Sequence, residues 1–249
     1  MSMYDAYMQP GNRGIEIISH RGGALRDDVL PMKAFARAID DGADRLECDV
    51  RRSSDGMLYI RHDPRVGKKL ASLKYSGIVA ELGAEQVPRL EDLFHLAKGR
   101  VRLILHLKER GIARAALELA RQYVELSDTL VISFRAIDLV EAKMAFQTVT
   151  TGLIVGRRVR SGVRAYASEF FPRLRARRAG VDMLVCKERL MGRLTRPLML
   201  RPGLPIIVWS VNTEAGLRRY LDDPVVVGIL TDDVALGLKM RAEVVRRPR

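Results

Sequence analysis

The chain has 249 residues, and nearly half of them (47%) are hydrophobic, so the composition favours a large buried core and argues against global disorder. The net charge of +13 at pH 7 points to an anionic partner, which would be a nucleic acid, an anionic membrane surface or an anionic substrate. Nucleic acid is not expected, because aromatic residues make up only 6% and the chain has neither a zinc-finger spacing nor an aromatic ribonucleoprotein motif.

Individual segments of the sequence, rather than its net charge, predict the compartment and any membrane attachment. No run of about 18 uncharged apolar residues is present, so no membrane-spanning helix is expected. Residues 1–14 lack the basic-then-apolar pattern of a secretory signal, and we expect a cytoplasmic protein, with peripheral attachment to a membrane left open. Cys48 and Cys186 lie in apolar runs and are expected to be buried thiols in a reducing compartment.

Short apolar runs typical of strands alternate along the chain with longer amphipathic stretches. The eight strand-like runs are 16–21, 45–50, 102–108, 129–134, 148–155, 181–187, 205–211 and 226–232. The helix-like stretches between and after them are 31–41, 88–98, 110–126, 135–146, 164–178, 188–200 and 213–223, with a last helix from near Thr231.

This alternation predicts an α/β fold with parallel strands buried on both faces. Eight βα units close naturally into a TIM (β/α)8 barrel, expected here as a single domain over residues 1–249, with a basic tail at 239–249. A doubly wound open sheet is the structural alternative. It usually has fewer strands and a glycine-rich phosphate loop, and the chain has no G-x-G-x-x-G motif.

One further strand-like run, residues 57–63, interrupts the alternation. It follows a turn signal at Asp55-Gly56, so we expect a β-hairpin that folds back from the second barrel strand. Residues 64–87 form the only long connection without a clear pattern, and we expect them to make a small excursion over the barrel mouth.

The second strand carries two acidic residues, Glu47 and Asp49, that share one face because strand side chains alternate. Apolar Leu46, Cys48 and Val50 suit the opposite face, so both carboxylates are expected to point into the barrel near its top. Two buried carboxylates repel unless a cation neutralises them, and a divalent metal is the simplest solution. The alternative is a pair of salt bridges to internal Lys or Arg.

The third strand repeats this arrangement with His106 and Lys108 on one face. His106 is a candidate metal ligand, and Lys108 is a candidate to meet a phosphate or to screen the carboxylates. In the alternative, His106 is merely hydrogen-bonded inside the barrel and Lys108 pairs with Glu47 or Asp49.

Two other histidines fall at strand ends, where a barrel of this type carries its active site. His20 and Arg21 end the first strand, and His62 ends the hairpin. Arginine suits bidentate phosphate binding, and two imidazoles beside one phosphate can act as general acid and base. His95 lies in a helix-like stretch and is expected to be structural or on the surface.

Together these residues resemble the motifs of the glycerophosphodiester phosphodiesterase family, a family of TIM barrels related to phospholipase C-like phosphodiesterases. The matching motifs span residues 15 to about 235: His20-Arg21-Gly22, Glu47-Cys48-Asp49, Asp55-Gly56, His62-Asp63, Pro88-Arg89-Leu90-Glu91, Ser133-Phe134, Val208 to Asn212, and Gly228 to Asp232. The first motifs are specific, whereas the later ones mainly support the fold.

The resemblance implies metal-dependent hydrolysis of a glycerophosphodiester to sn-glycerol 3-phosphate and an alcohol. It implies one divalent metal, Mg²⁺ or Ca²⁺, held by Glu47, Asp49 and a third carboxylate, with His20 and His62 as acid and base. A substrate hydroxyl next to the phosphate would attack first, and water would then open the cyclic phosphate. The metal and Arg21 would hold the developing charge on the phosphoryl oxygens.

The chain departs from the family pattern at two places. Residues 28–31 stand where the family has Pro-Glu-Asn-Thr, so the Glu and the Asn are absent. Asp27 or Asp28 would substitute for them only if the loop shifts. The family's Glu-x-Lys is here His106-Leu107-Lys108, so an imidazole stands where the third metal carboxylate would be. This exchange favours metals that accept nitrogen, such as Mn²⁺, Co²⁺ or Zn²⁺.

Several arginines follow the fifth strand, in two groups: Arg157, Arg158, Arg160 and Arg164, then Arg173, Arg175, Arg177 and Arg178. The first group would steer anionic substrates or touch anionic lipid heads, unless it is simply a solvated helix face. Trp209, on the seventh strand, would pack on the substrate's glycerol or alcohol moiety or else on the core. Two further functions stay open: cleavage of lysophospholipids or other phosphodiesters, and non-catalytic anion binding. The sequence does not specify the oligomeric state.

Overall fold

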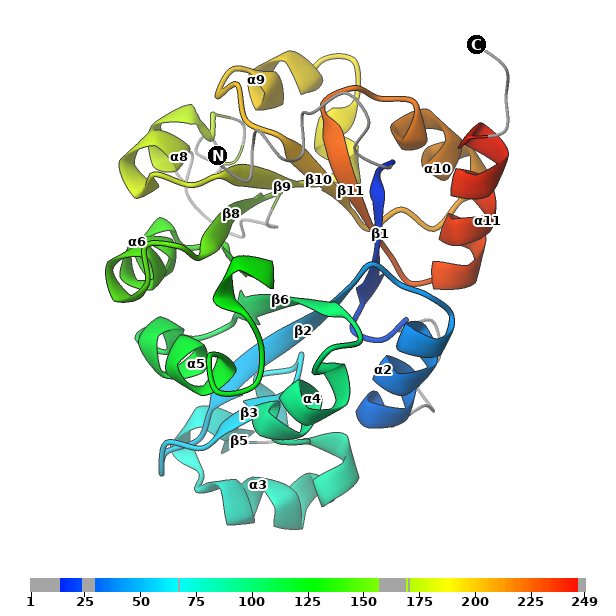
Figure 1. Ribbon diagram of the computed structural model, residues 1–249. Coiled ribbons are helices and arrows are strands. Elements are labelled where there is room, and N and C mark those ends of the chain that lie inside the picture. The colour runs from blue at the N-terminus through cyan, green and yellow to red at the C-terminus, as the bar shows by residue number, and fades with distance from the viewer. Residues whose placement is uncertain (1–13, 24–29, 67, 157–168, 170, 246–249) are drawn as a thin grey trace.

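Eight parallel strands close into a barrel in the computed structural model, which describes residues 14–23, 30–66, 68–156, 169 and 171–245 (Figure 1). The strands are β1 (Glu16–His20), β2 (Arg45–Arg52), β6 (Arg102–Leu107), β7 (Thr129–Ser133), β8 (Thr150–Val155), β9 (Met183–Lys187), β10 (Ile206–Trp209) and β11 (Val226–Thr231). Their order follows the chain from β2 through β6 to β11, and β1 pairs with both β11 and β2. The predicted TIM barrel is therefore confirmed.

Helices form the outer layer around this ring of strands, as Figure 1 shows. They are α2 (Pro31–Asp40), α4 (Leu90–Ala97), α5 (Ala113–Ala120), α6 (Ala136–Ala145), α8 (Arg173–Ala179), α9 (Arg196–Leu200), α10 (Glu214–Leu221) and α11 (Val234–Val245). Each strand is buried on both faces, which explains why the strand-like runs were apolar with few interruptions.

The buried residues divide into a layer between strands and helices and a smaller cluster inside the barrel. Leu46, Cys48 and Val50 of β2 belong to the outer layer, against the helices. Because successive side chains of a strand point to opposite faces, Glu47 and Asp49 point into the barrel, as the alternation predicted. The two cysteines are free and buried, and burial raises the pKa of both thiols.

The hairpin after the second strand is also confirmed. Strand β3 (Leu58–Ile60) pairs antiparallel with the end of β2, and the turn between them contains Gly56 at φ +90°, a conformation that favours glycine. The hairpin leaves the ring of parallel strands and carries the chain back to the barrel rim at residues 61–63.

The connection at residues 64–87 has more structure than its sequence pattern indicated. It contains β4 (Arg65–Val66), β5 (Lys68–Lys69), α3 (Tyr75–Leu82) and the 3₁₀ turns η1 (Leu70–Ser72) and η2 (Ala84–Gln86). A separate small core of Tyr59, Leu70, Ile78 and Val87 holds it together. The helix was missed because it is short and weakly amphipathic, with Gly77 in its first turn. In Figure 1, α3 lies at the edge of the molecule near β3 and β5.

The stretch at 188–200 was wrongly expected to be one helix. It forms a 3₁₀ turn, η4 (Glu188–Met191), and the short α9, because Gly192 and Pro197 interrupt helical hydrogen bonding. A further 3₁₀ turn, η3 (Leu126–Asp128), precedes β7. Arg157, Arg158, Arg160, Arg164, Asp27 and Asp28 lie outside the described residues. None of the helices in the described ranges is long and apolar enough to cross a membrane.

Candidate active site

Three predicted ligands lie together at the carboxyl ends of two neighbouring strands. Glu47 and Asp49 on β2 are each about 1% exposed, and His106 on β6 is paired in register with Asp49. The Nδ1 atom of His106 lies 2.9 Å from Asp49 Oδ1 and 3.3 Å from Glu47 Oε1. One ligand atom from each residue lies within 4.8 Å of the other two, which is close enough for a single cation to bind all three.

Asp49 is the more heavily compensated of the two carboxylates. Arg21 Nε lies 2.9 Å from its Oδ2, and Lys108 Nζ lies 3.2 Å from its Oδ1. Burial opposes ionisation of Asp49, but contact with His106 and the charges of Lys108 and Arg21 outweigh it and hold the pKa well below its usual value. Asp49 is therefore ionised at neutral pH, and the salt-bridge alternative applies to it.

Glu47 lacks that compensation. Its contact with His106 is the one ion pair it makes within the described part of the chain, and its Oε2 is buried with no hydrogen-bond partner there. The two oxygens of Asp49 also lack a well-aligned donor among the same residues. Buried carboxylate oxygens without donors are costly. Two carboxylate ligands and one imidazole ligand with available lone pairs fit a divalent cation.

His20, at the end of the first strand, is held by a residue that follows the last strand. Its Nδ1 lies 2.5 Å from Asp232 Oδ1, just beyond the end of β11, and Asn212 Nδ2 donates to Asp232 Oδ2. Burial raises the pKa of Asp232, but the hydrogen bonds and charge from His20, the Asn212 amide and Arg21 together lower it. Because the ionised carboxylate accepts, His20 Nδ1 carries the proton and Nε2 remains for a substrate.

A tight turn aims Arg21 at the carboxylates. Arg21 adopts φ +53° and Gly22 adopts φ +81°, both in the left-handed region. A Cβ on Gly22 would lie 2.7 Å from the Cβ of Ala34, so glycine is required there for contact with helix α2. The close approach that Gly22 permits is to this helix.

His62 lies at the exit of the hairpin and is far more open than His20. Its side chain is 46% exposed, and its Nδ1 lies 2.9 Å from the exposed carboxylate of Asp63. Partial burial, followed by the positive charges of Arg21 and Lys108, lowers the pKa of His62. Arg21 and Lys108, which contact Asp49, are therefore close enough to His62 for their charges to act on it.

Arg51 anchors the backbone that carries His62, a role the sequence did not suggest. Its Nε donates to the Arg61 carbonyl at 2.9 Å, and a terminal nitrogen donates to the His62 carbonyl at 2.7 Å. Glu109 holds the same guanidinium at 3.1 Å. Arg51 is buried and lies on the same face of β2 as Glu47 and Asp49, a spacing of two that was a usable signal.

Aromatic side chains form one wall of the mouth. The Phe134 ring lies 5.7 Å from the ring of His106 and 6.1 Å from that of Trp209. Trp209 is partly buried, its indole N–H donates to the Val185 carbonyl at 3.1 Å, and the Lys187 ammonium lies 5.2 Å from its ring centre. Trp209 therefore belongs both to the barrel lining and to the rim. His95, in contrast, packs against Tyr123 on the outside, as expected.

Asp232 and Asn212 are functional candidates that the sequence had quoted only as support for the fold. They come from the Val208 to Asn212 and Gly228 to Asp232 motifs, which end strands β10 and β11. Closure of a barrel pairs its first and last strands, which brings Asp232 near His20. That pairing was the available signal.

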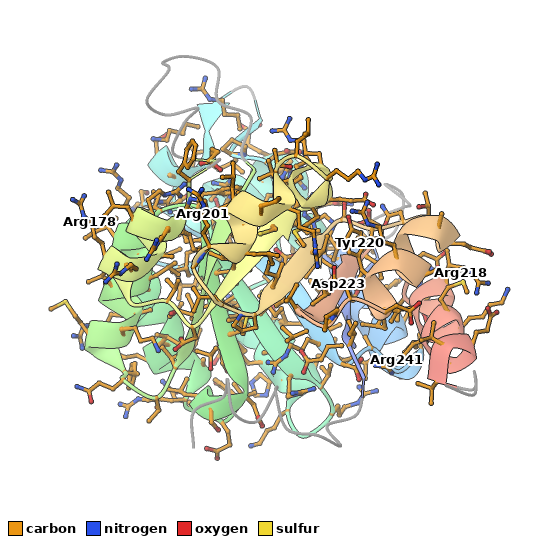
Figure 2. The ribbon with its side chains drawn as sticks, turned by 90° about the horizontal axis from the view of Figure 1, so that it is seen from above. Arg178, Arg201, Arg218, Tyr220, Asp223 and Arg241 are labelled. Carbon is orange, nitrogen blue, oxygen red and sulfur yellow. The ribbon has the colours of Figure 1, made fainter. Side chains whose placement is uncertain are left out.

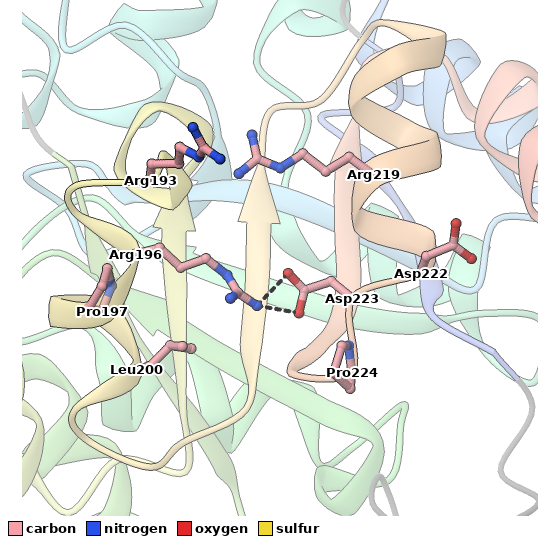
Figure 3. Close-up of a pocket in the computed structure, with 8 residues that line it drawn as sticks. All are labelled: Arg193, Arg196, Pro197, Leu200, Arg219, Asp222, Asp223 and Pro224. Carbon is pink, nitrogen blue, oxygen red and sulfur yellow. Dashed lines mark hydrogen bonds and ion pairs between the residues drawn. The ribbon is translucent and has the colours of Figure 1, made fainter.

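A separate hollow of about 540 Å³ lies between α9 and α10 on the outer surface, and Figure 3 shows its lining. Arg196 reaches across it to both carboxylate oxygens of Asp223, each at 2.8 Å. None of its lining residues belongs to the site above, so it does not bear on the chemistry there.

Comparison with known proteins agrees with this geometry. The profile of the glycerophosphoryl diester phosphodiesterase family matches residues 20–109, the stretch that carries His20, Glu47, Asp49, His62 and His106. A Mycobacterium tuberculosis protein named probable glycerophosphodiester phosphodiesterase 2 is 28% identical over 239 residues, covering 86% of both chains. YhdW of Bacillus subtilis, which bears the family's name, is 24% identical over 87% of this chain and 93% of its own.

Solved structures share the whole barrel. A glycerophosphodiester phosphodiesterase from Parabacteroides distasonis superposes with a TM-score of 0.78 at 21% identity, covering 95% of this chain and all of that one. An Oleispira antarctica phosphodiesterase, solved with its product sn-glycerol-3-phosphate, gives a TM-score of 0.71 at 19% identity over 91% and 96% of the two chains. Residues 20–109 thus match the glycerophosphoryl diester phosphodiesterase family, and over most of its length the chain is similar to proteins that bear that family's name.

Proposed function

We propose that the chain hydrolyses glycerophosphodiesters to sn-glycerol 3-phosphate and an alcohol, with the site at the barrel mouth as its catalytic centre. The family relationship supports the reaction class. The buried Glu47 oxygen without a donor, beside Asp49 and His106, is the observation that carries the metal-dependent form of this proposal.

Glu47, Asp49 and His106 would hold one divalent cation. When bound, it would neutralise charge on the phosphoryl oxygens as a Lewis acid. Arg21 and Lys108 already contact Asp49 and present their charges to the same mouth, so they are suited to bind the phosphate directly. Arginine offers a planar pair of donors for two phosphate oxygens, and lysine acts as a point charge.

The histidines would exchange protons with the substrate. His62 is neutral near pH 7 because its pKa is lowered, so it is suited to take the proton from the attacking glycerol hydroxyl. His20, acting as the imidazolium with Nδ1–H held by ionised Asp232, would deliver its Nε2 proton to the leaving alcohol oxygen. In the second step the two roles reverse: water loses a proton to His20, and the glycerol oxygen regains one from His62.

Turnover of glycerophosphodiesters by the purified chain tests the proposal. Glycerophosphocholine and glycerophosphoethanolamine would be assayed with each divalent metal in turn, and glycerol 3-phosphate would be quantified. We expect product with metal, no product with chelator, and loss of product in Glu47→Gln. A chain that binds metal yet cleaves no phosphodiester would instead be the non-catalytic anion-binding barrel.

An imidazole among the ligands leads to a second expectation, which concerns the preferred metal. Because His106 replaces a carboxylate, activity should be highest with Mn²⁺, Co²⁺ or Zn²⁺, and His106→Glu should shift the preference toward Mg²⁺ or Ca²⁺. A wild-type chain that works far better with Ca²⁺ or Mg²⁺ than with Mn²⁺ would remove His106 from the ligand set.

A lysophospholipid is the second candidate substrate. The mouth has an aromatic wall of Phe134 and Trp209 next to the site, which suits a substrate with an apolar part. Turnover of lysophosphatidylcholine, compared with that of glycerophosphocholine under one metal, separates the two substrates.

A further inference from the structure

Large apolar side chains are exposed on one sector of the barrel rim. Four of the six large hydrophobic residues that are exposed within the described ranges follow three neighbouring strands, β7, β8 and β9: Ile137 (62% exposed), Phe171 (53%), Leu174 (58%) and Leu194 (92%). Ile137 lies in the first turn of α6, Leu174 in that of α8, and Leu194 between η4 and α9. All four therefore lie in segments that leave the carboxyl ends of adjacent strands.

This sector adjoins the catalytic mouth. Arg175, next to Leu174, donates to the carbonyl of Phe134 at 2.5 Å, and the Phe134 ring lines the mouth beside His106. Helix α8 packs against α6, so the two helices present their first turns side by side. In Figure 3, Arg193, the neighbour of Leu194, lies near the arrowhead ends of the strands, on the side of the site.

The same sector is strongly basic. Residues 171–201 contain nine basic residues and only two acidic ones, which accounts for more than half of the chain's net charge of +13. Arg173, Arg177 and Arg178 are exposed on α8, and Arg177 and Arg178 follow Leu174 at three and four positions, on its face of the helix. Figure 2 shows Arg178 and Arg201 toward one side of the molecule, with Arg218 and Arg241 toward the other.

Exposed apolar side chains set among arginines are the composition of a surface that inserts into an anionic lipid interface. Apolar groups enter the boundary between head groups and acyl chains, and the arginines attract the negative surface. A patch of isolated hydrophobic residues alone would not select a partner, but the surrounding positive charge selects a negative one.

We propose that this rim, formed by Ile137, Phe171, Leu174, Leu194 and the arginines around them, docks the protein on an anionic bilayer. In that orientation the mouth faces the lipid. With the proposed function, on which this consequence rests, substrates would be taken from the lipid surface.

Vesicle flotation of the full chain tests the docking. We expect binding to vesicles of equimolar phosphatidylcholine and phosphatidylglycerol, little binding to phosphatidylcholine alone, and weakening at high salt. Phe171→Ser with Leu174→Ser should reduce binding at least about tenfold. Arg173→Gln with Arg193→Gln, which removes exposed charges at the start of α8 and beside Leu194, should reduce it roughly fivefold for each charge removed.

Matched controls lie at the far ends of the helices. Met144 (78% exposed) ends α6 and Val245 (73%) ends α11, so Met144→Ser and Val245→Ser remove equally exposed apolar groups outside the rim. Arg121→Gln, at the end of α5, is the charge control. These three variants should bind vesicles like the wild type.

Several results would overturn the docking: no wild-type binding to anionic vesicles, equal losses in rim and control variants, or self-association that the rim substitutions abolish, which would assign the rim to a second copy. Hydrolysis of soluble glycerophosphocholine is measured in parallel. Turnover without vesicle binding refutes the docking alone, whereas vesicle binding without turnover under any metal refutes the proposed function alone.

Discussion

The two histidines of the site differ in how the fold holds them. His20 ends a barrel strand, is largely buried, and is fixed by Asp232, which Asn212 holds in turn. His62 lies outside the ring of parallel strands, at the end of a hairpin, and almost half of its side chain is exposed. One imidazole is oriented through its ring nitrogen, whereas the other is positioned through its backbone, by Arg51.

The contrast explains how two imidazoles in one site can have different tasks in proton transfer. A ring whose Nδ1 is committed to an ionised carboxylate has a fixed tautomer and one working nitrogen. A ring near two cations and partly desolvated stays neutral, and its exposure leaves it free to meet a substrate. We therefore expect changes around His20 to act through side-chain contacts and changes around His62 to act through the loop.

Removal of either imidazole is the largest expected effect. His20→Ala and His62→Ala should each lower kcat/KM by at least about a thousandfold, because proton transfer in both steps needs both rings. Metal affinity, measured by calorimetry, should stay nearly unchanged in each variant. Substantial turnover in either one would remove that histidine from the mechanism.

The carboxylates beside the two rings should differ in importance. Asp232→Asn leaves the shape intact but allows the wrong tautomer of His20, so kcat should fall on the order of a hundredfold. Asp63→Asn, at an exposed pair, should change kcat by less than about threefold. Equal effects of the two substitutions in steady-state kinetics would erase the distinction between the histidines.

Arg51 sharpens the comparison from the loop side. Arg51→Gln releases the carbonyls of Arg61 and His62 and should lower kcat on the order of tenfold through misplacement of His62, with little change in metal affinity. Arg51→Lys should recover part of the loss. If Arg51 serves stability alone, the melting temperature would fall and kcat of the folded fraction would not.

Titration of His62 gives the smallest expected change. Because its pKa is lowered, the ring should lose its proton below the value of about 6.5 for a free imidazole, and the acid limb of kcat/KM should lie there too. Lys108→Met removes one of the charges that lowers this pKa, so the NMR transition of His62 should move to higher pH. If the transition does not move, or moves to lower pH, Lys108 does not lie at the same barrel mouth as His62.

Much of the fold follows from the sequence, because strand and helix periods alternate strongly along it. The runs at 16–21 and 226–232 were long by one residue at the carboxyl end, and the run at 205–211 by two. Helix α3 was missed because a short helix with a glycine in its first turn has little periodicity, and its small core depends on Tyr59 from the hairpin.

Site residues were predictable where two of them share one strand, and less so where residues from the first and last strands meet. Glu47 with Asp49 and His106 with Lys108 stood out by their spacing of two. Asp232 lies 212 positions from His20, and only closure of the barrel joins them. Arg51 shares the spacing of two with Glu47 and Asp49, but its role could not be assigned, because it holds backbone carbonyls, which sequence patterns do not reveal.

Calorimetric titration of the purified chain with Mn²⁺ measures whether Glu47, Asp49 and His106 form one cation site. We expect one ion bound per chain, with affinity at least about tenfold weaker in Glu47→Gln. A chain that binds no divalent ion, or whose affinity is unchanged in Glu47→Gln, would contradict it.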